Sequence, residues 1–394
     1  LCELGIDYVV VVRGSIFSVE KTRPDFHEPT GFNIDVCRSI RSALPAHVAV
    51  FLQGSIVEVG QAEWAMNDGV CDAVEMTRAQ IADPDLVQKI SNDQHTQIRP
   101  CIRCNQTCQV RDARNPIVTC VSEPTSGHEL QDPNWYTTSS SPRHITVVGA
   151  GVAGLETARV AALRGHSVTI VEKSSSTGGI AAIAGPGQPL VAWLNSEIDR
   201  LKVRVELGQE FDGSSVSNSQ VVVQATGAQR GVTEYEIISG AVVLDIADVR
   251  RGISVLPESG VVIILDPIGG PIGVSLAEEL GDRAILVTPD NIAGNELSRT
   301  GDLAPANVRL AQRGAQVQRR SVVRAVEKRD TNFVVRVQDR FSGALTEIEC
   351  AAVVDAGFRL PTDPMTGAVQ IGDCVAPRTI LEAILEARRS ALNI

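Results

Sequence analysis

Long apolar runs and an excess of basic residues are both missing from this sequence of 394 residues. No apolar stretch approaches the ~20 residues that a membrane-spanning helix needs. Lysine and arginine number 36 against 47 aspartates and glutamates, which gives a net charge of −11. This charge argues against a nucleic-acid partner, and no basic run indicates a membrane surface. With 43 % apolar and 21 % charged residues, the chain has the composition of a globular protein of two or three domains.

A signal peptide and an initiator methionine are also missing, because the chain begins at Leu1, Cys2 and Glu3. We therefore expect this sequence to be the later part of something longer. Without a secretory context, nine cysteines indicate a reducing compartment, and we expect a cytoplasmic location. Five of the cysteines have no regular spacing and are expected to be small buried hydrophobic residues; they are Cys2, Cys37, Cys71, Cys350 and Cys374.

The other four cysteines lie in one short stretch, RPCIRCNQTCQVRDARNPIVTC, at Arg99–Cys120. Their spacing is C-x2-C-x3-C-x11-C, and the residues are Cys101, Cys104, Cys108 and Cys120. Four thiolates are the ligand set of an iron–sulfur cluster, which is the favoured interpretation. Zinc is the main alternative, although zinc ribbons usually pair two C-x2-C knuckles and the second half here is a single cysteine. Disulfides are disfavoured by the expected reducing compartment.

Residues 1–95 predict three βα units of a parallel sheet. Apolar, largely β-branched runs predict strands at 6–12, 48–52 and 73–76, with helices expected at 32–44, 58–67 and 83–90. Three such units cannot close a (βα)8 barrel, which takes about 250 residues. The loops after the second and third strands carry Gly54, Ser55 and Arg78. In barrel enzymes a phosphate commonly binds at the loops after the last two strands.

A second motif follows a linker that we expect at 121–143. The strand 144–148 leads into Gly149-Ala150-Gly151-Val152-Ala153-Gly154, a helix, and a second strand that ends at Glu172. This is G-x-G-x-x-G in its full strand–turn–helix context. Gly149 would make the tight turn, Gly151 would admit a pyrophosphate, Gly154 would let the helix pack on the strand, and Glu172 would accept ribose hydroxyls. The motif predicts a site for a dinucleotide or for ADP.

The run CDAVEMTRAQIADPDLVQKI, followed by RPCIRCNQTC, resembles the old yellow enzyme-like iron–sulfur flavoproteins of the 2,4-dienoyl-CoA reductase and trimethylamine dehydrogenase type. The resemblance covers essentially the whole chain, but about five of the eight units of the family's FMN barrel have no counterpart here. It implies that Gly54, Ser55 and Arg78 hold the FMN phosphate and that the four clustered cysteines ligate [4Fe-4S]. The family's catalytic acid or hydroxyl lies on early strands that have no counterpart here, so we assign no catalytic residue.

The resemblance also extends to the second motif. Gly178-Gly179 and the run Val221–Gly227 resemble FAD domains of flavoprotein disulfide reductases, with Thr226 and Gly227 at the end of that run. Gly372 and Asp373 resemble the last FAD contact of that fold. These positions imply FAD, while the trimethylamine dehydrogenase type also allows ADP alone.

A second Rossmann unit is expected around the strand 261–265, and it departs from the dinucleotide pattern. Ile268 stands where we expect the first glycine, and no acid closes the second strand at Thr288. We therefore expect this unit to be structural. The predicted fold class is α/β, with these domains: 1–95, C-terminal units of an FMN barrel; 96–143, the [4Fe-4S] segment and linker; 144–229 with 356–394, FAD or ADP binding; 230–355, an inserted degenerate NAD(P)-like unit.

The expected function is that of an iron–sulfur flavoprotein oxidoreductase with FMN, a [4Fe-4S] cluster and FAD or ADP. The degenerate second unit favours an amine dehydrogenase or N-demethylase that takes a small-molecule substrate and gives electrons to a carrier such as an electron-transfer flavoprotein. An NAD(P)H-dependent enoate or 2,4-dienoyl-CoA reductase is the alternative; the CNQxC spacing and the run Gly127-His128-Glu129 favour it. A third possibility is an electron-transfer subunit, or a fragment, whose partner completes the barrel, since unpaired strand edges must be covered. We also expect an oligomer.

Overall fold

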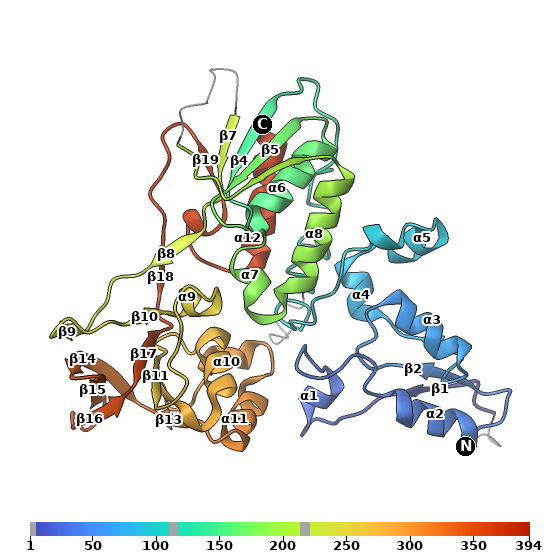
Figure 1. The fold of residues 1–394 in the computed structure, drawn as a ribbon. Helices are drawn as coiled ribbons and strands as arrows, with labels where there is room; N and C mark the ends of the chain where they lie inside the picture. The colour runs from blue at the N-terminus through green and yellow to red at the C-terminus, as the bar shows by residue number, and fades with distance from the viewer. Residues whose placement is uncertain (1–4, 110–116, 213–220) are drawn as a thin grey trace.

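The structure is a computed structural model, and it describes residues 5–109, 117–212 and 221–394. Three groups of elements are seen in Figure 1. Residues 5–97, in blue, lie at the lower right, and the part built around residues 144–207 and 369–394 lies at the top. The remaining group, in yellow to red-brown, lies at the lower left. None of the helices in the described ranges is long and apolar enough to cross a membrane.

The first group is a three-stranded parallel sheet in the order β1-β2-β3, as the sequence predicts. The strands are β1 (Tyr8–Val11), β2 (Ala49–Leu52) and β3 (Ala73–Val74). The helices are α1 (Val19–Thr22), α2 (Ile34–Ala43), α3 (Val59–Asn67), α4 (Thr77–Ala82), α5 (Leu86–Ser91) and the 3-10 helix η2 (His95–Gln97). Apolar residues of β1, β2, α2 and α3 form one buried core. The outer strand β1 is partly exposed, with Tyr8 60 % and Val10 38 % exposed.

Two local expectations in this group are wrong. Thr77 and Arg78 do not lie in a loop but form the first turn of α4, and the helix expected at 83–90 is the shorter α5. Asp83 lies between the two helices in an extended conformation, which the following Pro84 favours. Its buried carboxylate accepts a hydrogen bond from the Arg99 backbone N–H at 2.7 Å. The helix expected at 83–90 therefore begins only after Pro84, at Leu86.

Residues 98–109 and 117–143 contain no helix or strand. The linker expected at 121–143 begins later than predicted, since Val121, Ser122 and Glu123 are buried. These residues pack against the next group instead of spanning solvent, and Val121 belongs to its core.

The second group is a five-stranded parallel sheet in the order β19-β7-β4-β5-β6. The strands are β4 (His144–Val148), β5 (Ser167–Glu172), β6 (Arg204–Leu207), β7 (Val221–Gln224) and β19 (Val369–Gln370). The helices are α6 (Val152–Leu163), α7 (Ile180–Ile183), α8 (Gln188–Arg200) and α12 (Ile380–Asn393), with 3-10 turns η3 (Gly185–Gly187) and η6 (Gly372–Cys374). Helix α6 is buried without interruption from Val152 to Ala161, because α8 and α12 pack beside it. It lies between α12 and α8 in the upper part of Figure 1.

The third group joins a parallel sheet, ordered β10-β17-β11-β12-β13, to a four-stranded sheet ordered β16-β15-β14-β9. The first sheet has β10 (Leu244–Asp245), β11 (Val262–Leu265), β12 (Ala284–Val287), β13 (Gln316–Gln318) and β17 (Ala352–Asp355). The second has β9 (Glu236–Ile238), β14 (Ser321–Arg329), β15 (Asn332–Asp339) and β16 (Leu345–Cys350). The helices are α9 (Ile246–Arg250), α10 (Pro271–Leu280) and α11 (Leu303–Gln312), with 3-10 turns η4 (Gly281–Arg283) and η5 (Asn295–Arg299).

The chain enters and leaves this third group through two short antiparallel strands, β8 (Ala228–Arg230) and β18 (Arg359–Pro361). They run side by side between the top and the lower left of Figure 1. The third group is thus inserted between β7 and β19 of the second group.

Candidate functional site

All four clustered cysteines line one pocket, together with Arg78 and Arg103. Burial raises the pKa of each of the four thiols, and the Arg78 guanidinium acts in the opposite direction on the pKa of Cys101 and Cys108. Four half-buried thiols that line one pocket with a cation beside them fit a metal centre that takes thiolate ligands, because the metal removes the cost of burying the deprotonated sulfurs.

The loop between Cys101 and Cys108 has an unusual backbone conformation on both sides of Cys104. Arg103 (φ +54°) and Asn105 (φ +52°) flank Cys104 in the left-handed region, which non-glycine residues rarely adopt. The Arg103 backbone N–H donates a hydrogen bond to Cys101 Sγ at 3.4 Å. The Gln106 backbone N–H donates to the sulfur of Cys104, and the Ser122 backbone N–H donates to the sulfur of Cys120. Such N–H···S bonds stabilise thiolates and belong to the levers that tune iron–sulfur clusters.

Side chains around the cysteine pocket bind the loop at 23–28, which follows α1. Arg78 Nη1 donates to the Pro24 carbonyl at 2.8 Å, and Asn105 Nδ2 donates to the Arg23 carbonyl at 2.7 Å. Arg103 Nη1 donates to the Glu28 carbonyl. Two side chains of the cysteine segment, Arg103 and Asn105, therefore bind backbone carbonyls of the first group.

The structure brings Ser55 and Arg78 together, as a shared phosphate site requires. Arg78 Nη2 donates a short hydrogen bond to Ser55 Oγ. Gly54 has φ +148°, and a Cβ there would lie 2.8 Å from the Asn33 side chain, so the position accepts no larger residue without movement. The residues fit a bound anion, but Arg78 also donates to Pro24 and to Asn105 Oδ1, so most of its donors already have partners.

The three glycines after β4 differ in what surrounds them. A Cβ on Gly149 would lie 2.4 Å from the Ala225 carbonyl oxygen, and one on Gly154 would lie 1.9 Å from the Gly149 oxygen. Nothing lies within 4 Å of a Cβ on Gly151, the N-cap residue of α6. Two glycines are thus needed for close backbone packing, while the third faces open space at the helix N-terminus, where a pyrophosphate fits.

The other predicted dinucleotide residues gather around this turn. Glu172 Oε2 accepts the Ala150 N–H at 2.7 Å, and Gly178 N–H donates to the Ala150 carbonyl at 2.7 Å. A Cβ on the neighbouring Gly179 would lie 3.5 Å from Gly151 Cα. A Cβ on Gly372 would lie 2.9 Å from Ala153 Cβ, so the loop carrying Asp373 also packs against the start of α6.

Thr226 and Gly227 follow β7 at the same end of the sheet. Thr226 Oγ1 lies 2.6 Å from Thr362 Oγ1, and Gly227 has φ +79° with open space around it. Asp373 Oδ1 accepts the Arg378 N–H at 3.1 Å, and burial raises the pKa of its carboxyl group. The residues present fit a dinucleotide or ADP bound across the N-terminus of α6.

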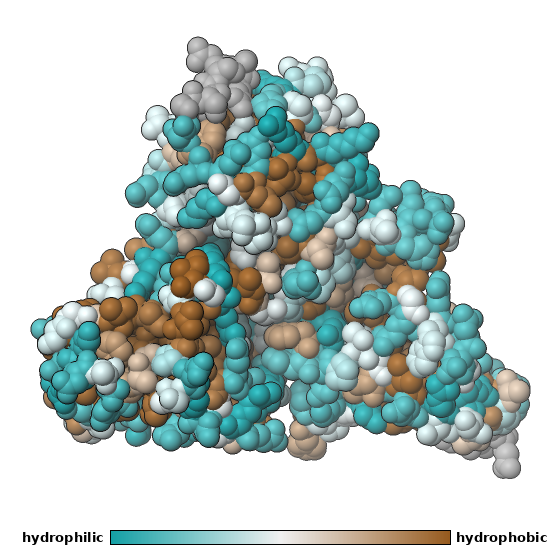
Figure 2. All heavy atoms as spheres, in the orientation of Figure 1, coloured by the Kyte–Doolittle hydropathy of each residue, from teal (hydrophilic) through white to brown (hydrophobic). Residues whose placement is uncertain are grey.

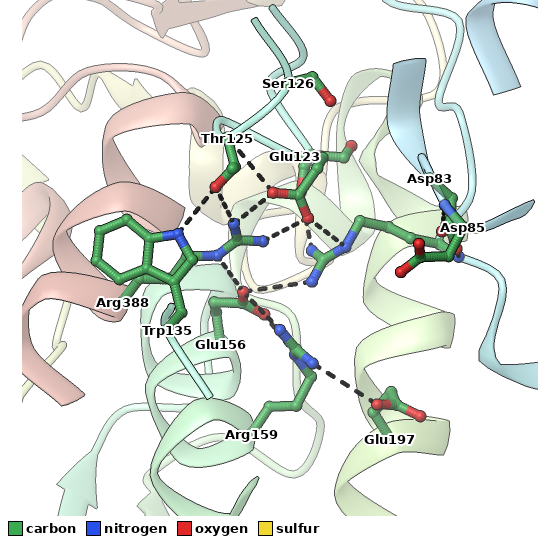
Figure 3. A network of polar contacts seen from close by, with 12 residues as sticks. Asp83, Asp85, Glu123, Thr125, Ser126, Trp135, Glu156, Arg159, Glu197 and Arg388 are labelled. Carbon is green, nitrogen blue, oxygen red and sulfur yellow. Dashed lines mark hydrogen bonds and ion pairs between the residues drawn. The ribbon is translucent and has the colours of Figure 1, made fainter. Parts of the chain in front are cut away.

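A buried network of charged side chains, which sequence analysis missed, links the cysteine segment to the second group (Figure 3). Glu156 of α6 is fully buried and accepts hydrogen bonds from Arg159 Nε at 2.8 Å, Arg388 Nε at 2.9 Å and Arg99 Nη2 at 3.3 Å. Arg388 Nη2 also donates to Glu123 Oε2 at 2.7 Å. Attraction to the arginines holds the pKa of Glu156 far below its usual range, despite burial.

This network flanks the four clustered cysteines in sequence, because Arg99 is two residues before Cys101 and Glu123 is three residues after Cys120. The Arg99 guanidinium also lies 4.2 Å from the Trp193 ring centroid, over its face. The chain separations of 57, 232 and 265 residues leave no local pattern that could have revealed the network.

The turn of the second Rossmann-type unit differs from the prediction. Asp266, and not Ile268, takes the place of the first glycine, since its backbone N–H donates to the Val287 carbonyl as Gly149 N–H does to Val171. Ile268 is 37 % exposed, so it does not fill the turn.

Comparisons with known proteins agree with this architecture. The family model for pyridine nucleotide-disulphide oxidoreductases matches residues 121–244. N,N-dimethylglycine/sarcosine dehydrogenase of Chromohalobacter salexigens is 31 % identical over 87 % of this chain and 57 % of its own length. The multifunctional alkene reductase/demethylase OYE of Caballeronia cordobensis is 30 % identical over 64 % of this chain and 38 % of its own.

The chain belongs to the old yellow enzyme-like flavoprotein family. The solved structure of histamine dehydrogenase from Rhizobium sp. 4-9 has the same fold, with a TM-score of 0.86, 24 % identity and coverage of 98 % of this chain and 61 % of that one. The predicted α/β fold class of this family member is thereby confirmed. The chain spans about half the length of the curated relatives it matches.

Proposed function

We propose that this family member carries a [4Fe-4S] cluster and flavin cofactors as part of an iron–sulfur flavoprotein oxidoreductase. The observation that carries the proposal is the single pocket that Cys101, Cys104, Cys108 and Cys120 line beside Arg78. Four thiolates complete the ligand set of such a cluster, and the guanidinium offsets its negative charge. When bound, the cluster and the flavins supply the electron-transfer chemistry, while the chain binds and orients them.

FAD, or ADP alone, is proposed to bind at the N-terminus of α6. Gly151 would admit the pyrophosphate, and Glu172 would accept the ribose hydroxyls. Three further loops would line the same site; they carry Gly179, Thr226 with Gly227, and Gly372 with Asp373. The open space at Gly151 and the close packing at Gly149 and Gly154 support this proposal.

FMN is proposed to bind with its phosphate at Gly54, Ser55 and Arg78. The contact between Ser55 and Arg78 supports it. The exposed apolar side chains of β1 support the further proposal that additional βα units, from a longer chain or from a partner subunit, cover this strand. A copurifying polypeptide that protects β1 from hydrogen exchange is the expected result, whereas a stable FMN-loaded monomer would contradict the partner proposal.

The substrate is proposed to be a small secondary or tertiary amine, oxidised with transfer of electrons to an external carrier such as an electron-transfer flavoprotein. Similarity over most of this chain to a dimethylglycine/sarcosine dehydrogenase supports this direction. The alternative is NAD(P)H-dependent reduction of an activated alkene, and similarity to a protein named both alkene reductase and demethylase supports it. Anaerobic turnover of N-methyl amines with an artificial acceptor, compared with NADPH-dependent alkene reduction, separates the two.

Iron and flavin content of the anaerobically purified chain tests the cofactor proposal directly. We expect about four irons per chain and one FAD or ADP, with retention of FMN depending on closure of the barrel. Replacement of Cys104 by serine should remove the iron, whereas the same change at the buried Cys350, far from the pocket in sequence and in a different core, should not. Purified protein with one zinc and no iron would refute the cluster.

A further inference from the structure

The two Rossmann-type units of the chain have matching strands but different turns. In both units the first residue after the first strand donates its N–H to the neighbouring strand: Gly149 to Val171 at 2.8 Å, and Asp266 to Val287 at 2.9 Å. One residue separates Gly149 from the N-cap of α6, Gly151. Three residues separate Asp266 from the N-cap of α10, Gly270. The second turn is therefore longer, and it begins with a carboxylate.

The Asp266 carboxylate lies where the backbone N–H groups of this turn converge. Its side chain is 1 % exposed, and Oδ1 accepts the Gly269 N–H at 2.9 Å. The N–H groups of Ile268 and Gly270 are also directed at the carboxylate. In a dinucleotide-binding Rossmann unit, the N–H groups of this turn and of the helix N-terminus hold the pyrophosphate. Here the donors already have an anionic partner from the chain itself.

The first turn of α10 is built around the same side chain. A Cβ on Gly273 would lie 2.9 Å from Asp266 Cγ, whereas a Cβ on the corresponding Gly154 would meet the Gly149 carbonyl oxygen. The glycine of the second unit therefore makes room for the aspartate instead of for a close strand–helix contact. Asp266 Oδ2 has no hydrogen-bond partner among the described residues, and burial raises the pKa of the carboxyl group to about 6.

We propose that Asp266 closes the second Rossmann-type unit to NAD(P)H, because its carboxylate occupies the anion position that the pyrophosphate of a dinucleotide would need. A phosphate approaching the same N–H groups would face a buried carboxylate and gain no free donors. Together with the proposed function, on which this consequence rests, closure of the unit means that electrons would not enter or leave through a nicotinamide bound there.

Calorimetric titration of the full chain with NAD+ and NADP+, after saturation of the first unit with FAD, tests the assignment. The wild-type chain should show no saturable binding below millimolar concentration. Asp266→Gly frees the N–H groups and should tighten binding of at least one dinucleotide tenfold or more. Asp290→Asn is the matched control, because Asp290 lies beside Gly269 without bonding the turn, and it should bind no better than wild type.

Two outcomes would overturn the proposal. One is micromolar binding of either dinucleotide to the FAD-saturated wild type. The other is an Asp266→Gly variant that has the melting temperature of the wild type but binds neither dinucleotide more tightly, since exclusion of the dinucleotide would then depend on other residues. If the glycine variant does not fold, Asp266→Ser replaces it. Iron and FAD contents, measured in the same samples, report on the proposed function separately, because neither cofactor contacts this turn in the proposal.

Discussion

Replacing Glu156 by glutamine should destabilise the chain far more than the loss of one hydrogen bond. Three buried arginines of the network are balanced by three glutamates; the residues are Arg99, Arg159, Arg388, Glu123, Glu156 and Glu197. Glutamine has nearly the same shape but removes one negative charge and points an N–H donor at arginine donors. Leaving one buried positive charge without a partner costs about 3–5 kcal/mol. We expect the free energy of unfolding to fall by that amount.

The control is Glu296→Gln, which removes the carboxylate of another i,i+3 glutamate–arginine pair, Glu296 and Arg299, at the surface. An exposed pair of this kind contributes about 0–1 kcal/mol. Urea denaturation of both variants, followed by circular dichroism under anaerobic conditions, gives the comparison. Equal losses of less than about 1 kcal/mol in the two variants would refute the view that the buried network stabilises the packing of the cysteine segment.

The pH dependence of the same variant adds a second measurement. Because the arginines depress the pKa of Glu156 in the folded chain, its contribution to stability is complete above the ordinary glutamate pKa and is lost as the pH falls below it. The acid side of the stability profile should therefore be flatter in Glu156→Gln than in wild type. Iron content should fall with stability, since Arg99 and Glu123 flank the outer cysteines of the cluster stretch.

Three further predictions concern the proposed sites. Cys120→Ser should lower iron content by at least half, measured by colorimetric iron assay, because one of four ligands is lost; full iron would contradict its role. Asp266→Asn should raise the free energy of unfolding by about 2–3 kcal/mol at pH 8 and leave it unchanged at pH 4. The reason is that a carboxyl group whose pKa in the folded chain is raised to about 6 destabilises the fold only at a pH where it ionises. Thermal denaturation at the two pH values measures the difference in stability between the variant and the wild type. Gly154→Ala should destabilise the chain and abolish FAD binding, since its Cβ would lie 1.9 Å from a backbone oxygen, whereas Gly60→Ala in α3, with open space around it, should be neutral or slightly stabilising; similar melting temperatures for the two variants would contradict the packing argument.

The sequence alone predicted those features whose causes are local. The strand–turn–helix at residues 144–163 agrees with the structure because β-branched runs, glycine spacing and apolar periodicity all act within a few residues. The convergence of the four cysteines was predictable for the same reason, since three of them lie within eight residues and must share one neighbourhood. Whether the pocket holds iron stays a prediction that the iron assay decides.

Features that depend on partners far apart in the chain were decided only by the tertiary structure. Arg99, Glu156 and Arg388 look like ordinary surface charges in sequence, and only packing of α6 against α12 and the cysteine segment buries them together. The role of Asp266 depends on the register between β11 and β12, which shows where the turn begins. Local sterics specify turns and helices, whereas long-range electrostatic pairing has no characteristic spacing, so only the folded chain shows which charges meet.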